Sequence, residues 1–137
     1  MRYLLDTHVL SELRKGGRAN NWVRAWFEAC ADQELCTSVL VLGELRRGIE
    51  GLRLRDPSDA AALEQWLARL HVSFADRVLD IDGAVADRWG RLNVPDPVPT
   101  VDGLLAATAL VHGLVLVTRN VRDVHRTGVD LLNPFSP

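Results

Sequence analysis

The segment DGLLAATALVHGLVLVT, from Asp102 to Thr118, limits the folds open to this chain more than any other stretch. Its first part, Asp102 to His112, predicts a helix that is apolar on nearly every side, and such a helix is buried. Gly113 ends that helix, and Leu114 to Val117 is apolar throughout, which predicts a strand covered on both faces. The chain therefore needs a sheet with helices packed against it.

Shorter segments of the two kinds alternate along the rest of the chain. Apolar residues at helical spacing predict helices over residues 20–31, 39–52, 57–71 and 82–92, and a short helix before a loop at 14–18. Short apolar runs predict strands over residues 3–5, 34–37, 77–81 and 129–132. Because strands that alternate with helices are typical of an α/β sandwich with a parallel sheet, we expect this fold class.

Size and composition restrict the class of protein. A chain of 137 residues fits one domain, so we expect a single unit over residues 1–137. No apolar stretch reaches the roughly 18 residues of a membrane-spanning helix, and the first residues lack the pattern of an export signal. Cys30 and Cys36 lack metal-site spacing, which favours reduced thiols in a cytoplasmic protein. The formal net charge of −2 does not attract nucleic acid, so any polyanion must be held locally.

Three aspartates stand near the ends of predicted elements. Asp6 follows the first strand directly, and Asp123 follows the strand at 114–117 after a few residues. Sites in a parallel α/β sheet form beyond the carboxyl ends of the strands, so we expect Asp6 and Asp123 to converge there. Asp102 stands in the first turn of the buried helix, where the alternative to a site is a helix cap or a carboxylate that offsets the helix dipole.

A glutamate, Glu44, lies at the edge of the apolar stripe in the segment VLVLGELRRGIEGL. A carboxylate at this position is partly removed from water and needs a partner. The structural alternative to a functional role is an ion pair with Arg46 or Arg47 on the same predicted helix.

Together, Asp6, Glu44, Asp102 and Asp123 form a candidate catalytic site without histidine or cysteine. An all-anionic cluster repels itself unless a hard cation fills it, and Mg²⁺ or Mn²⁺ prefers oxygen ligands. The implied chemistry is metal-assisted attack of water on a phosphodiester. Ser11 is close enough along the first helix to steady a carboxylate or a metal-held water, or it is only a helix-surface serine.

Three stretches occur in the order LLDTHVLSEL, GELRRGIEGL and DGLLAATALVHGLVLVTRNVRDV, and the last is followed by LLNPF. They resemble the PIN domain and, more narrowly, the VapC-type and FitB-type toxins of bacterial toxin–antitoxin pairs. The resemblance covers the chain from end to end. It implies a PIN-like three-layer α/β/α sandwich with a small, mostly parallel sheet, and a Mg²⁺-dependent ribonuclease whose metal is held by Asp6, Glu44 and Asp102.

The resemblance assigns the fourth acid of the family less directly. Many relatives have an acid immediately after the Thr-Arg pair that follows the buried strand, whereas this chain has Asn120 there and Asp123 as the nearest acid. Either side chain can fill the role. His8 stands where relatives commonly have asparagine, and it either makes local hydrogen bonds at the helix start or contacts RNA phosphate.

The resemblance also implies partners. These are an RNA substrate, a VapB-like antitoxin whose tail enters and blocks the active site, and a second copy of the chain in a homodimer, or a heterocomplex with the antitoxin. Arginines that flank the proposed acids are candidates for contacts with RNA phosphate, and their alternative is ion pairing with those acids. They are Arg46, Arg47, Arg119 and Arg122.

Two other classes of function compete with a nuclease. A nucleophilic phosphatase would have a second aspartate where this chain has His8, and a receiver domain needs a late lysine, whereas the only lysine is Lys15. The more serious alternative is a degenerate PIN domain that binds RNA or protein without cleavage. The three matching acids argue against it, but Asn120 leaves it open. Cleavage that requires a metal ion and Asp6 would separate the enzyme from the binding module.

Overall fold

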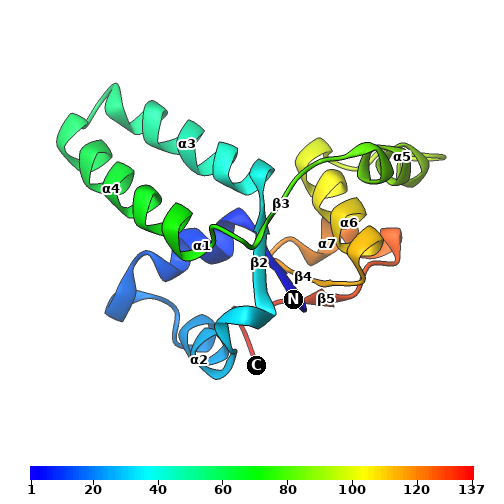
Figure 1. Ribbon diagram of the computed structural model, residues 1–137, viewed down its shortest axis with the longest axis horizontal. Coiled ribbons are helices and arrows are strands. Elements are labelled where there is room, and N and C mark those ends of the chain that lie inside the picture. Colours follow the sequence, from blue (N-terminus) through cyan, green and yellow to red (C-terminus); the bar gives the residue numbers. More distant parts are fainter.

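The central sheet is entirely parallel and has five strands in the order β3-β2-β1-β4-β5 (Figure 1). The computed structural model describes all residues, 1–137, and places β1 at the centre of the sheet, paired with β2 and β4. Leu4 and Leu5 of β1 are fully buried, as expected of a strand with helices on both faces. The strands are β1 Tyr3–Leu5, β2 Leu35–Ser38, β3 Val78–Leu79, β4 Val115–Val117 and β5 Leu131–Leu132.

Helices cover the sheet on both sides. They are α1 Thr7–Leu13, α2 Asn21–Ala29, α3 Val39–Arg53, α4 Pro57–Ser73, α5 Gly83–Leu92, α6 Thr100–His112 and α7 Val121–Val124. The long α3 and α4 pack together on one side, and α5, α6 and α7 gather on the other (Figure 1). The expected α/β/α sandwich is confirmed, and its sheet is parallel throughout. None of the helices has the length and apolarity needed to cross a lipid bilayer.

The buried helix predicted from Asp102 is α6, which begins slightly earlier, at Thr100. A methyl group at Gly103 would lie 2.5 Å from Cγ2 of Val98 and 3.3 Å from Cδ1 of Trp89. Only glycine therefore lets α6 approach α5 and the loop before α6 this closely. This packing fixes the start of α6, and with it Asp102, against the rest of the domain.

The edge strands are shorter than the sequence pattern predicts. β3 covers only Val78–Leu79 of the predicted 77–81, since the chain then turns into α5, which the Asp82 side chain caps by accepting a hydrogen bond from the Val85 N–H at 3.0 Å. β5 begins at Leu131 rather than Val129, since the Val129 N–H still donates to the Thr127 hydroxyl of the preceding turn at 3.3 Å. The single-turn helix α7 is absent from the sequence-based prediction, since one turn contains no apolar repeat.

Candidate acidic active site

Asp6 is the first residue beyond β1, and both of its carboxylate oxygens accept hydrogen bonds. Oδ1 accepts from the backbone N–H of Thr7 at 2.6 Å, where Asp6 caps α1. Oδ2 accepts from the hydroxyl of Thr118, just beyond β4, at 2.7 Å. With only 3% of Asp6 exposed, these contacts hold its carboxylate rigidly at the carboxyl edge of the sheet.

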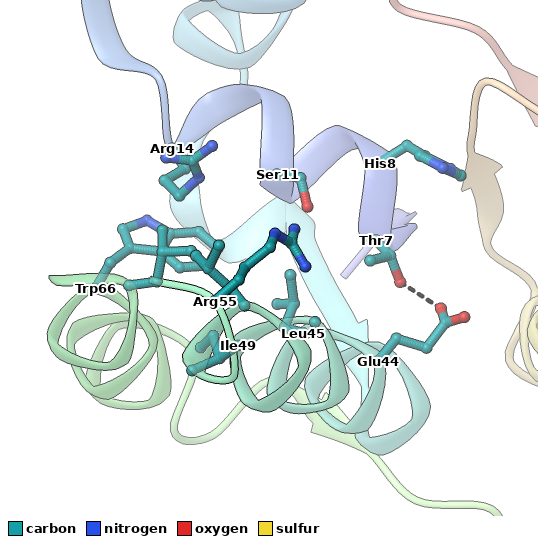
Figure 2. Close-up of a pocket in the computed structure, with 12 residues that line it drawn as sticks. Thr7, His8, Ser11, Arg14, Glu44, Leu45, Ile49, Arg55 and Trp66 are labelled. Carbon is teal, nitrogen blue, oxygen red and sulfur yellow. Dashed lines mark hydrogen bonds between the residues drawn. The ribbon is translucent and has the colours of Figure 1, made fainter. Parts of the chain in front are cut away.

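Glu44 lies on α3 and is half-buried, as its place at the edge of the apolar stripe predicts. Its partner is the hydroxyl of Thr7, which donates a hydrogen bond to Oε1 at 2.5 Å (Figure 2). The alternative of an ion pair with Arg46 or Arg47 is wrong, because Arg46 instead pairs with two other glutamates, and Arg47 makes no ion pair. Thr7 thus connects two of the acids, because its N–H donates to Asp6 and its hydroxyl donates to Glu44.

Asp102 is half-buried in the first turn of α6, and its side chain does not cap that helix. Burial and, after it, the negative charges of Asp6, Asp123 and Glu44 raise the pKa of Asp102 to about 6, while His8 acts to lower it. The helix cap predicted as one alternative is therefore wrong, whereas the other, a carboxylate in the first turn that offsets the helix dipole, agrees with the position of Asp102. Three other carboxylates thus act electrostatically on Asp102.

A cleft of about 460 Å³ opens beside these side chains. It is lined by Asp6, Thr7, His8, Glu44, Pro99, Thr100, Val101, Asp102 and Asn120. The exposed Asp123 on α7 does not line it, although its charge acts on Asp102. The backbone N–H of Asn120 donates to the Thr118 hydroxyl at 3.0 Å, and this bond places Asn120 at the cleft. The two candidates for the fourth role are therefore placed differently: Asn120 lines the cleft, whereas Asp123 lies outside its lining and affects Asp102 through its charge.

The donor chemistry of the cleft fits a hard divalent cation. No three acidic, histidine or cysteine side chains stand close enough to form a complete set of metal ligands as they are arranged. A complete set is not required for Mg²⁺, which usually keeps several waters and takes only one or two carboxylates directly. The mutual repulsion that raises the pKa of Asp102 is also what a cation would offset.

The family model that describes the PIN domain matches residues 3–129. The chain belongs to the PIN domain family. Among PIN relatives it is similar to the VapC ribonuclease Y4jK of Sinorhizobium fredii, with 32% identity over 138 residues that cover 98% of each chain. It is also similar to the plasmid stability protein StbB of Pseudomonas syringae pv. tomato, with 31% identity over 137 residues that cover 96% of this chain and 97% of the relative.

Solved PIN structures share the fold along nearly the whole chain. The crystal structure of FitAcB from Neisseria gonorrhoeae superposes with a TM-score of 0.89 and 28% identity, covering 98% of this chain and 99% of that one. The structure of FitAB bound to an IR36 DNA fragment gives a TM-score of 0.87 and 26% identity, covering 98% of this chain and 96% of that one.

The remaining predicted residues of this PIN domain, Ser11 and the four arginines, do not line the cleft. Ser11 makes no hydrogen bond to a carboxylate and lines a neighbouring groove instead. The guanidinium of Arg119 stacks over the ring of Phe135, 4.5 Å from its centroid. Arg47 and Arg122 are exposed and make no ion pair, so they stay candidates for RNA phosphate.

Two residues of the site, Thr7 and Thr118, are missing from the sequence-based prediction. Their hydroxyls hold Glu44 and Asp6, respectively. Their position in the sequence is the signal that could have identified them, because each stands within two residues of the end of a buried strand.

Proposed function

We propose that this PIN domain is the toxic ribonuclease of a type II toxin–antitoxin pair. It cleaves RNA phosphodiester bonds with a divalent metal ion, Mg²⁺ or alternatively Mn²⁺. The observation that carries the proposal is the cleft in which the carboxylates of Asp6, Glu44 and Asp102 lie together, with His8 as the one nitrogen donor among its side chains that could bind a metal and no sulfur donor. The relative named VapC ribonuclease and the toxin–antitoxin complexes with this fold support it.

In this proposal Asp6, Glu44 and Asp102 hold the ion, and Asp123 or Asn120 completes the site. When bound, the metal supplies positive charge that makes water a better nucleophile and offsets the charge on the leaving oxygen. Asp6 keeps its position since both of its oxygens are hydrogen-bonded, and the Thr7 hydroxyl orients Glu44. The pKa of Asp102 is about 6, so its carboxylate is charged at neutral pH and can contribute to holding the ion.

The partners in this proposal are RNA and an antitoxin. A VapB-like antitoxin blocks the acidic cleft, and the toxin forms a heterocomplex with it or a homodimer. The whole chain, residues 1–137, acts as one PIN unit in the cytoplasm.

The test is RNA cleavage by the purified chain, freed of any antitoxin. We expect it to cut a structured RNA in Mg²⁺ or Mn²⁺, to stop when a chelator is added, and to resume when excess metal is restored. Cutting that continues in chelator would contradict the metal mechanism. Tight RNA binding without cutting in either ion would favour the alternative, a degenerate PIN domain that acts as a binding module, for which the amide of Asn120 at the cleft is the supporting observation.

A pair of variants separates the two candidates for the fourth acidic role. We expect Asp123→Ala to weaken metal affinity about tenfold or more, since it removes a negative charge that acts on Asp102. The cleavage rate, measured at increasing metal concentration, gives both the metal affinity and the maximal rate. If Asp123→Ala leaves both quantities unchanged while Asn120→Ala lowers them, Asn120 fills the role instead.

A further inference from the structure

A second hollow, a groove of about 360 Å³, adjoins the acidic cleft. It lies between α1 and the α3–α4 pair, and it shares Thr7, His8 and Glu44 with the cleft (Figure 2). A molecule that occupies the cleft can therefore continue into the groove without leaving the surface. The rest of the lining is Ser11, Arg14, Leu45, Gly48, Ile49, Leu52, Arg55, Leu63 and Trp66.

The groove has an apolar floor and two cationic side chains. Leu45 and Ile49 are buried beneath it, and the indole of Trp66 forms part of its far end. Arg14 follows the last turn of α1, Arg55 follows α3, and both side chains extend toward the space between these helices (Figure 2). The groove therefore offers positive charge and an aromatic surface next to the acids.

Neither Arg14 nor Arg55 has a partner for its guanidinium: both are exposed, and neither donates a side-chain hydrogen bond or forms an ion pair. Other arginines are engaged, such as Arg46 with Glu50 and Glu64. An unpaired guanidinium can bind a phosphate without first giving up a carboxylate.

Charge balance indicates what these arginines bind. An RNA strand at the cleft meets the carboxylates of Asp6, Glu44 and Asp102. These carboxylates repel every phosphate whose charge the metal does not offset. The phosphates next to the scissile one need positive charge nearby, and the groove supplies it directly beside the cleft.

We propose, on the basis of the function proposed above, that this groove binds the nucleotides adjacent to the scissile phosphate in a single-stranded RNA. Arg14 and Arg55 bind two backbone phosphates, and an unpaired base lies against Trp66 and the aliphatic floor. Single-stranded RNA fits because its bases are free to stack on apolar and aromatic side chains, whereas bases in a duplex are not. A protein segment would also suit the apolar floor, but it does not account for two cations facing a site that acts on phosphate.

The test is RNA binding with a chelator present, so that no strand is cut, measured by fluorescence anisotropy of a single-stranded oligoribonucleotide of about twelve nucleotides. For the double variant Arg14→Ala/Arg55→Ala we expect affinity to fall about tenfold or more. We also expect the slope of log K against log salt to decrease in magnitude by about 1.4, or about 0.7 for each phosphate that an arginine no longer neutralises. The matched duplex should bind more weakly than the single strand.

The matched control is Arg18→Ala/Arg69→Ala, which removes the same charge from two exposed, unpaired arginines outside the groove. We expect it to keep most of the affinity and the salt slope. Equal losses of affinity in the two double variants would overturn the proposal. An unchanged salt slope in Arg14→Ala/Arg55→Ala would also overturn it, and it is the result expected if the groove binds a protein segment instead of RNA.

Kinetics provide a second readout in the presence of Mg²⁺. We expect Arg14→Ala/Arg55→Ala to raise KM about tenfold with little change in kcat, since contacts away from the reacting bond bind substrate and transition state alike. A fall in kcat with unchanged KM would overturn the assignment. If wild-type protein neither binds nor cuts RNA, the proposed function fails, whereas wild-type activity with an unaffected double variant rejects the groove alone.

Discussion

Asp6→Asn is expected to lower RNA cleavage at least about a hundredfold without unfolding the protein. The amide keeps an oxygen that can accept from the Thr7 N–H, and its NH₂ can donate to the Thr118 hydroxyl, so both local contacts persist. What the variant lacks is the negative charge that would hold the cation. Because this charge is buried and repels Asp102, its removal should leave the melting temperature unchanged or higher.

Asp130→Asn is the matched control, since Asp130 is exposed and its side chain makes no hydrogen bond or ion pair. It should cleave RNA at the wild-type rate. Cleavage assays on both variants, purified identically, are compared with thermal unfolding. Undiminished cutting by Asp6→Asn would point to a contaminating nuclease or to another site in the chain.

Asp102→Asn is expected to remove the effect of pH on stability at this site. The pKa of Asp102 in the folded protein is about 6, against an ordinary value of 3.8, so the folded state holds this proton more tightly than the unfolded state. The resulting stability is fully present below about pH 3.8 and is lost as pH rises through about 6. Asparagine mimics the neutral carboxyl and removes this loss.

Relative to wild type, the metal-free Asp102→Asn protein should therefore gain stability as pH rises from about 4 to about 7. The gain is on the order of 1 kcal/mol after discounting for solvent screening, or about 3 °C in melting temperature. Saturating Mg²⁺ should stabilise wild type at neutral pH and affect the variant much less, because metal binding requires the ionised carboxylate. Melting curves over this pH range, with and without Mg²⁺, measure both effects. A stability difference that is constant with pH would show that Asp102 has no raised pKa.

Much of the fold follows from the sequence because its strongest signals are local. The apolar helix before Gly113 and the apolar run after it predict α6 and β4 correctly, since both must be buried on all sides. The short edge strands are less predictable, because two paired residues contain too little pattern to separate from a loop. The end of β3 is set by the next helix: Asp82 caps α5, so the residues just before it leave the strand.

The site is predictable in part for a similar reason. Asp6 is found from its place after a strand, and Asp102 from its place at the start of a buried helix. The partner of Glu44 is not, since Thr7 is distant in sequence and the two meet only when α1 and α3 pack together. Arg14 and Arg55 are also missed, because a groove formed by three helices leaves no periodic signal in the sequence.

The place of β1 has a consequence for synthesis of the chain. β1, Tyr3–Leu5, is made before the other four strands and yet lies between two of them in the sheet. The carboxylate of Asp6 gains its Thr118 hydrogen bond only after 112 further residues have been made. A nascent chain therefore cannot hold Asp6 by both of its carboxylate oxygens until Thr118 has been made. A fragment that stops before β4 lacks this bond, so we expect toxicity only from molecules that extend beyond Thr118.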